Sequence, residues 1–173
     1  MKKMLLLTAL FALTVLATAV AQAAPASATA TASASAVIVT PLAIAKTVDL
    51  DFGKVATGPS TGTVVITPAG VQSSTGDVKT IAAGSSPKAA AFSVTGETGA
   101  TYAITLPTSA TITRMSGSET MTVNTFTSNP SGAGTLPAGP QTLNVGATLN
   151  VGAQATQTAG TYTGTFTVTV QYN

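Results

Sequence analysis

The sequence predicts an all-β sandwich of roughly seven to nine strands. Threonine is abundant and helix formers other than alanine are scarce, and β-branched threonine suits a half-exposed strand. The 16 glycines and 9 prolines interrupt the chain at short intervals. Apolar and polar residues alternate between these interruptions, which is typical of short strands joined by turns. At 173 residues, a single domain is expected.

Residues 1–23 are predicted to be a secretory signal peptide that is removed on export. Lys2 and Lys3 precede an apolar stretch over residues 4–16, and Ala21-Gln22-Ala23 has the small-x-small pattern of a cleavage site. A membrane anchor is the alternative, but threonines interrupt the run. No later stretch reaches the roughly 18 apolar residues of a membrane span. We therefore expect no transmembrane segment after cleavage and a location in the periplasm, at the cell surface or outside the cell.

The mature chain is nearly neutral and lacks the side chains of most common chemistry. Two of the seven Lys and Arg residues lie in the signal peptide, which leaves as many basic as acidic residues, five of each. These few charges are scattered, so we expect no nucleic-acid binding. Histidine, cysteine and tryptophan are absent. Histidine-based catalysis, thiolate nucleophiles and Cys/His metal sites are thereby excluded, and we predict neither an enzyme nor a cofactor.

The β-sandwich domain is predicted to span residues 37–173. It follows an extension, residues 24–36, in which alanine alternates with serine and threonine. This extension is either a linker left by processing or a strand donated to a neighbouring subunit. Val37-Ile38-Val39 is predicted to open the domain, and Pro41 demands a sheet edge or a break directly afterwards.

Alternation predicts the strands that follow, and Gly96 to Gly99 is predicted to be a hairpin turn. The strands are expected around Val48/Leu50/Phe52, Thr63–Thr67, Phe92/Val94, Tyr102/Ile104/Leu106, Ile112, Met121/Val123 and Leu143/Val145.

One internal repeat is visible, because Thr142–Ala147 has the same sequence as Thr148–Ala153. Two copies are too few for a solenoid. We expect two short strands, or one bent strand with Gly146 as the bend or bulge.

The clearest strand is the last one, Tyr162–Tyr172. Its even positions carry mostly aromatic residues and valine, and its odd positions carry threonine and glutamine. This period-2 pattern over eleven residues predicts a single strand with one face in the core and the other in water.

The order of these motifs resembles the bacterial family called domain of unknown function 4402. The resemblance rests on five motifs: Phe92–Gly96, Tyr102–Pro107, Met121–Val123, Leu143–Ala147 and Ala159–Gly164. It implies an exported, cysteine-poor β-sandwich of immunoglobulin-like or pilin-like type and no known activity. The terminal alternating strand is also similar to those of spore-coat-U and chaperone–usher pilin subunits.

Few carboxylates suggest a site. Asp49 and Asp51 point the same way on a strand and are candidates for Ca²⁺, but that ion needs six to eight oxygens, so a solvated strand face is the better interpretation. Glu97 and Glu119 are candidates for a glycosidase pair. Both fall in turn-like segments, and we interpret them as solvated loop charges.

The tyrosines are predicted to be structural. Tyr162, in Gly160–Gly164, is similar to a tyrosine corner, in which the phenol bonds a nearby backbone group. Tyr102, Tyr162 and Tyr172 all fall on the apolar side of their strands, so we expect core positions rather than a platform for sugars.

Assembly through sheet edges is the leading functional expectation. Unpaired edges invite another chain, and the segment from Thr165 to Tyr172 is uncharged and β-prone. The sequence predicts a structural or adhesive surface protein, such as a fimbria-like subunit, that associates with itself or with other envelope proteins. The alternative is a monomeric exported domain that binds a carbohydrate or a protein through its loops. The candidate assembly residues are Val37, Val39, Leu42, Phe166, Val168, Val170 and Tyr172.

Overall fold

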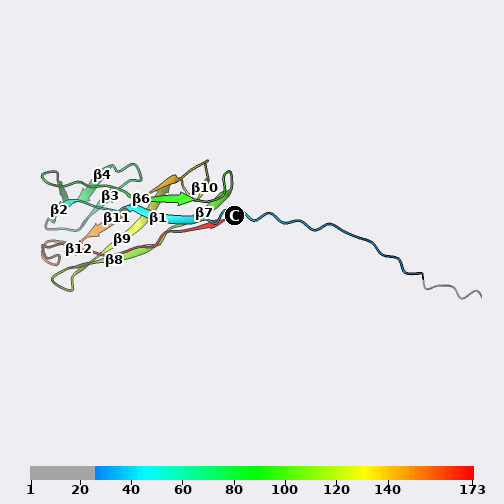
Figure 1. The fold of residues 1–173 in the computed structure, drawn as a ribbon. Coiled ribbons are helices and arrows are strands. Elements are labelled where there is room, and N and C mark those ends of the chain that lie inside the picture. The colour runs from blue at the N-terminus through cyan, green and yellow to red at the C-terminus, as the bar shows by residue number, and fades with distance from the viewer. Residues whose placement is uncertain (1–25) are drawn as a thin grey trace, which may run out of the picture. The chain divides into compact units, whose positions relative to one another are not determined.

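A computed structural model describes residues 26–173 (Figure 1). The predicted signal peptide, residues 1–23, lies outside the described residues. Residues 26–37 are extended and exposed, and residues 38–173 form a compact unit. That unit contains strands and turns without a helix, so the predicted all-β sandwich is confirmed. The described part has thirteen strands, more than expected, because several are only two or three residues long.

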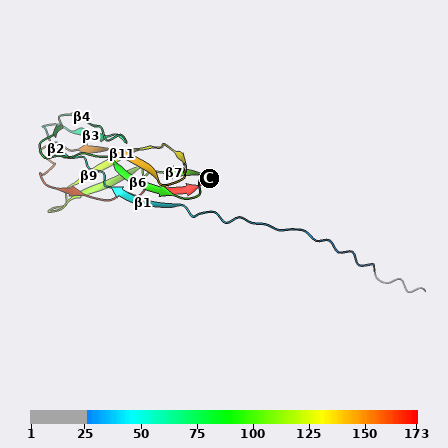
Figure 2. The same ribbon diagram turned by 45° about the horizontal axis from the view of Figure 1, so that its top comes forward.

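The strands form three antiparallel groups (Figures 1 and 2). The largest is an eight-stranded sheet ordered β1 (Ala43–Val48), β6 (Ala90–Thr95), β11 (Gln141–Val151), β9 (Thr120–Asn129), β8 (Ser109–Arg114) and β12 (Tyr162–Thr163), to which β3 (Gly62–Ile66) adds on β11 and β4 (Gln72–Gly76) adds on β3. The second sheet is ordered β10 (Ala133–Thr135), β7 (Thr101–Thr105) and β13 (Thr169–Tyr172). The third pairs β2 (Lys54–Ala56) with β5 (Lys79–Ile81).

The internal repeat forms one bent strand, β11, at the centre of the large sheet. Its first half pairs with β6 and its second half with β3, while β9 runs along the other side. The register against β9 shifts between Gly146 and Thr148, but the extra residue lies on β9, where Thr125 and Phe126 together face Ala147 and Thr125 has a φ of 49°. The predicted bulge at Gly146 is therefore wrong, and the bulge belongs to the partner strand. A Cβ atom at Gly146 would lie 2.2 Å from the carbonyl oxygen of Ile66. Only glycine therefore lets the start of the β3–β4 turn cross β11 this closely.

The hydrophobic core divides along β11 into two clusters. Leu143 and Val145 belong to the first cluster, and Leu149 and Val151 belong to the second. The six-residue repeat places equivalent side chains on the same face because six is a multiple of the strand period of two. The half-buried Phe126 contacts both clusters and joins them into one interior.

The predicted eleven-residue terminal strand is wrong as a single strand. Burial alternates except at the exposed Gly164. However, β12 ends at Thr163 and pairs with β8, whereas β13 begins at Thr169 and pairs with β7 in the other sheet. A Cβ atom at Gly164 would lie 2.3 Å from the carbonyl oxygen of Thr111. The chain thus passes very close to β8 at Gly164, and residues 164–168 cross between sheets.

Two further expectations need correction. Gly96 to Gly99 does not close a hairpin, because both edges of β6 are occupied by β1 and β11, so the turn leads into β7 of the other sheet. Val37-Ile38-Val39 does not form the opening strand either. These residues are exposed, and the first strand begins at Ala43, just beyond Pro41.

Candidate assembly groove

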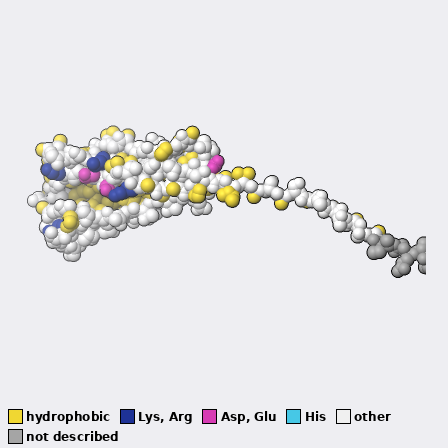
Figure 3. Space-filling view, viewed as in Figure 1, with side chains coloured by type: hydrophobic (Ala, Val, Ile, Leu, Met, Phe, Trp, Pro, Cys, Tyr) yellow, Lys and Arg dark blue, Asp and Glu magenta, His cyan; other side chains and the backbone are white. Residues whose placement is uncertain are grey.

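An elongated groove of about 1200 Å³ opens on one side of the sandwich. Residues 46–57 form one rim and residues 154–166 form the other. Figure 3 shows the hollow, with hydrophobic atoms on its floor and charged side chains beside it. Its volume exceeds the range of about 300–1,000 Å³ that is common for small-molecule pockets.

Each rim contains an edge strand of the eight-stranded sheet. β1 ends the strand order on one side and β12 ends it on the other. Beyond β1, Asp51 exchanges two backbone hydrogen bonds of 2.9 Å with Lys88. Neighbouring residues of an extended chain direct their backbone groups to opposite sides. The backbone N–H and C=O of Leu50 therefore point away from Lys88. Beyond β12, residues 164–168 are in no strand. The groove is therefore an open position between two edges of one curled sheet.

The floor of the groove is the apolar inner face of the large sheet. It consists of half-buried and buried side chains from β8, β9 and β11. These side chains are Ala110, Ile112, Met121, Val123, Leu149 and Val151. No charged side chain lies among these floor residues, so the floor favours an apolar occupant.

Tyr162 anchors the rim that contains β12. Its hydroxyl donates a hydrogen bond of 2.6 Å to the carbonyl oxygen of Thr158 and accepts one of 2.7 Å from Nε2 of Gln157. The predicted tyrosine corner is confirmed, because the phenol bonds a backbone group four residues upstream. The backbone N–H of Met115 also donates to the carbonyl oxygen of Thr161 at 2.9 Å, so the β8–β9 turn supports this rim.

An ion pair in the β8–β9 turn supports the same region. Nε of Arg114 lies 2.7 Å from Oε2 of Glu119, and Nη2 of Arg114 donates to Oε1 at 3.1 Å. This two-pronged contact, together with a hydrogen bond from the Thr158 side chain, lowers the pKa of Glu119 to about 2. Glu119 is thus a paired structural carboxylate rather than the free loop charge expected from the sequence.

Glu97 lies far from Glu119. Gln141 pairs with Val94, just before Glu97, and Asn150 pairs with Thr122, just after Glu119. The two carboxylates therefore flank opposite ends of β11, roughly 30 Å apart at about 3.3 Å per residue. Carboxyl pairs of glycosidases are about 5–9.5 Å apart, so this arrangement does not form such a pair.

Glu97 instead secures the start of β1. The backbone N–H of Thr40 donates to its Oε2 at 3.0 Å, and this bond lowers the pKa of Glu97. The Tyr172 hydroxyl bonds the same place, since it accepts from the N–H of Glu97 and donates to the carbonyl oxygen of Thr40, both at 2.7 Å. This contact among Thr40, Glu97 and Tyr172 closes the gap between the start of β1 and the end of β13.

The two aspartates of the predicted calcium candidate have partners within the chain. Asp49 pairs with Nζ of Lys46 at 2.6 Å, and Oδ1 of Asp51 accepts the backbone N–H of Gly53 at 2.7 Å. Within residues 26–173, no three His, Cys, Asp or Glu side chains gather in a way that could hold a metal ion. Both aspartates line the charged rim of the groove.

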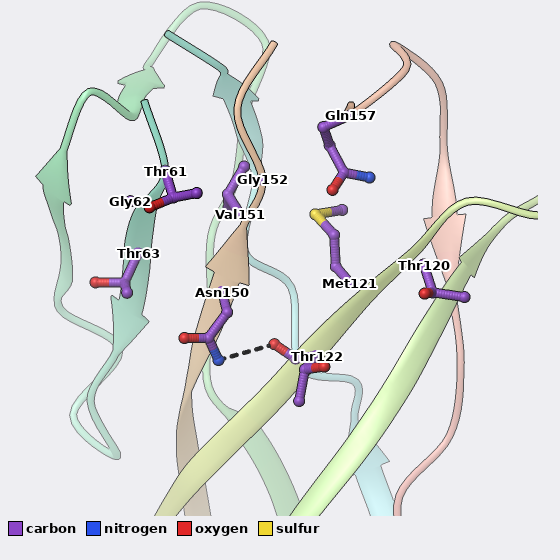
Figure 4. Close-up of a pocket in the computed structure, with 10 residues that line it drawn as sticks. All are labelled: Thr61, Gly62, Thr63, Thr120, Met121, Thr122, Asn150, Val151, Gly152 and Gln157. Carbon is purple, nitrogen blue, oxygen red and sulfur yellow. Dashed lines mark hydrogen bonds between the residues drawn. The ribbon is translucent and has the colours of Figure 1, made fainter. Parts of the chain in front are cut away.

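A second, smaller hollow adjoins the groove. This recess of about 440 Å³ lies between β3, β9 and β11, and its lining includes Met121, Val151 and Gln157, which also line the groove. Figure 4 shows its threonine hydroxyls and the Nδ2 of Asn150, which donates to the carbonyl oxygen of Thr122 at 3.2 Å. Its lining side chains are uncharged, so the recess provides no acid or base for catalysis.

The predicted assembly residues fall into two groups. Val37 is 89% exposed and Val39 is 50% exposed. The other five pack against the first core cluster of their own domain: Leu42, Phe166, Val168, Val170 and Tyr172. Phe166, for example, lies 5.0 Å from Phe126 and 6.3 Å from Phe92 between ring centroids. Among these seven, Val37 and Val39 thus have the side chains most accessible to a neighbour.

The remaining tyrosine is also turned inward. Tyr102 is completely buried, which raises its pKa, and its hydroxyl donates to Oε1 of Gln141 at 2.7 Å. With Tyr162 and Tyr172 bonded inside the domain as well, the tyrosines form no exposed platform of the kind that stacks on sugars.

Sequence reasoning did not identify the groove itself. The available signal was Gly164, which interrupts the terminal alternation where the chain leaves the sheet. Alternation alone places side chains on a face but leaves the partner of each edge undetermined. The opposing rims are therefore a product of the tertiary structure.

Comparison with known proteins places the chain in a family. The family model described as a domain of unknown function (DUF4402) matches residues 42–172, well over half of the chain. No curated protein and no solved structure gives a match. None of the described residues forms a helix long and apolar enough to cross a membrane. The chain thus belongs to the DUF4402 family, as its strand motifs suggested.

Proposed function

We propose that this protein is a non-enzymatic, exported structural or adhesive subunit that assembles by adding a β-strand between copies. The observation that carries the proposal is the open groove, because two sheet edges face each other across an apolar floor. A strand placed there completes backbone hydrogen bonds at both rims and covers the floor. The absence of histidine and cysteine supports a non-enzymatic role.

The chemistry of the rims also supports an interaction with a polypeptide. The rim of residues 154–166 carries no charge, whereas the opposite rim carries Lys46, Asp49, Asp51 and Lys54. The described contacts pair Lys46 with Asp49. Natural proteins commonly protect an edge strand with charges, and the uncharged rim lacks this protection.

Two neighbouring residues on β8 provide a matched test. Ala110 lines the groove floor and is half-buried, whereas Thr111 is exposed and does not line the groove. In Ala110→Lys a charge enters the groove, and in Thr111→Lys the same charge lies outside it. We expect the mature chain, from residue 24, to form oligomers with rising concentration in analytical ultracentrifugation. Thr111→Lys should preserve these oligomers and Ala110→Lys should abolish them.

Thermal unfolding of both variants controls for folding. If Ala110→Lys unfolds, Thr165→Lys at the exposed rim replaces it, because Thr165 lies outside the strands. A mature chain that stays monomeric at every concentration, without filaments by electron microscopy, would contradict the proposed function.

A further inference from the structure

We infer that the groove between β1 and β12 accepts the N-terminal extension of a second copy of this chain, residues 26–39. The inference rests on the proposed function and names the occupant of the groove. Three features support it. They are the shape of the groove, the alternating pattern of the extension, and the hydrogen-bonded contact among Thr40, Glu97 and Tyr172 at the start of β1.

The groove has the length and the pattern of a missing strand. Its floor follows β11 from the level of Ala90, which pairs with Val145, to Val151. This distance is about 20 Å at roughly 3.3 Å per residue. An occupant strand of six to eight residues, on the order of 20–26 Å, therefore covers the floor. In such a strand every second side chain points down to the apolar floor, and the others point to water.

The extension matches this pattern. Residues 26–39 include no charged residue, and alanine occupies every even position from Ala28 to Ala36, followed by Ile38. The odd positions from Ser27 to Ser35 carry only serine and threonine. One face is thus apolar and the other is polar. Residues 26–39 reach about 45 Å when extended, enough to fill the groove and leave a tether.

Within residues 26–173, nothing covers the apolar end of the extension. Ile38 is 97% exposed and Val37 is 89% exposed, next to the half-exposed Val39. Three consecutive exposed aliphatic side chains are unfavourable in water unless a partner covers them. The groove floor, with Ile112, Met121 and their neighbours, is an apolar surface that no strand of the described residues covers.

The hydrogen-bonded contact among Thr40, Glu97 and Tyr172 favours insertion of the extension into the groove of a second copy over insertion into the groove of its own chain. Thr40 is held by its backbone N–H and its carbonyl oxygen at the start of β1. The groove lies further along the chain direction, beginning at Lys46. To fill its own groove, a chain would have to reverse its direction within a few residues before Thr40, whose two backbone groups are already held by Glu97 and Tyr172. The extension of a second copy can enter the groove without this reversal.

The absence of native cysteine permits a direct test. One full-length mature chain carries Ile38→Cys, and a second carries Ala110→Cys on the groove floor. A matched control carries Thr111→Cys, the adjacent exposed residue outside the groove. The two chains are mixed under mild oxidation and mixed disulfide dimers are measured by non-reducing electrophoresis. A disulfide requires Cβ atoms about 3.5–4.5 Å apart. Ala56→Cys, on the rim of residues 46–57, is therefore tested in parallel, so that a different register of the inserted strand is also detected.

The inference predicts mixed dimers with a groove cysteine and almost none with Thr111→Cys. Thiols brought together by binding have an effective concentration on the order of millimolar, so at about 10 μM chain the groove pair should form on the order of 100-fold faster than the control. Charge on the extension, in Val37→Asp combined with Ile38→Asp, should abolish the oligomers while the melting temperature of the domain is retained.

Other outcomes separate the inference from the proposed function. Oligomers that form without a groove disulfide, or that survive the double aspartate variant, would overturn the inference and leave assembly intact. A chain that remains monomeric would overturn both. A double variant with Ile38→Cys and Ala110→Cys in one chain that forms only an internal disulfide would show self-insertion and would also overturn the inference.

Discussion

The two glycines of the internal repeat should differ strongly in their response to the same substitution. Gly146 and Gly152 both follow Thr-Leu-Asn-Val and precede alanine. Replacement of either by alanine removes the same conformational freedom from the unfolded chain, which by itself stabilises by about 0.4–1 kcal/mol. The repeat therefore gives a matched pair in which the folded structure alone decides the difference.

The environments of the two glycines differ sharply. A Cβ atom at Gly146 would lie 2.2 Å from the carbonyl oxygen of Ile66, with backbone atoms of Thr67 and Pro68 at 2.6 and 2.8 Å. These atoms must retreat by as much as an ångström, and backbone cannot rotate away as a side chain can. At Gly152 the nearest atoms are the side-chain ends of Gln157 at 3.0 Å and Thr156 at 3.3 Å, which can move.

We expect Gly146→Ala to lower the free energy of unfolding by about 2–3 kcal/mol, the upper part of the range for overpacked interiors. This corresponds to a fall in melting temperature of about 4–12 °C for a chain of this size. Gly152→Ala should stay within about 0.5 kcal/mol of the unmodified protein.

The assay is thermal and guanidinium unfolding of the mature chain, followed by far-ultraviolet circular dichroism at low concentration. Equal stability of the two variants would refute the reasoning, because it would mean that β11 does not cross the β3–β4 turn at Gly146. A larger loss in Gly152→Ala would refute it as well.

Three further predictions concern single side chains. Tyr162→Phe removes the hydrogen bond to Thr158 and should lower the free energy of unfolding by about 1 kcal/mol in denaturant titrations; an unchanged midpoint would contradict the tyrosine corner. The Glu119 pKa is lowered from 4.5 to about 2, so its pairing with Arg114 should stabilise the fold fully above pH 4.5 and fade as the pH falls toward 2. The unmodified chain should melt at a higher temperature than Glu119→Gln above pH 4.5, and this difference should shrink as the pH falls toward 2. A difference that stays constant would count against a stabilising role of the Arg114–Glu119 pair. The hydroxyl of Ser128 is buried without a hydrogen-bond partner within residues 26–173, so Ser128→Ala should be neutral or stabilising by up to about 1 kcal/mol in the same unfolding assay, and a clear loss of stability would reveal an undetected partner.

The sequence by itself determined the class of fold and the inward faces of the strands. Threonine-rich alternation predicted an all-β chain, and the burial of Leu143, Val145, Leu149 and Val151 follows the repeat. The corner at Tyr162 was also predictable, because its hydrogen bond reaches only four residues upstream. These features depend on short stretches of chain, where side-chain period and local geometry carry the information.

Only the tertiary structure decided which edges pair and which stay open. The pattern of Tyr162–Tyr172 is the same whether the segment lies in one sheet or crosses between two, because backbone hydrogen bonds form without regard to side-chain identity. The close approach of Gly164 to Thr111 ended β12, and the curl of the large sheet brought that edge opposite β1. The groove results from this long-range arrangement, since its two rims are about a hundred residues apart in the chain and meet only when the sheet folds.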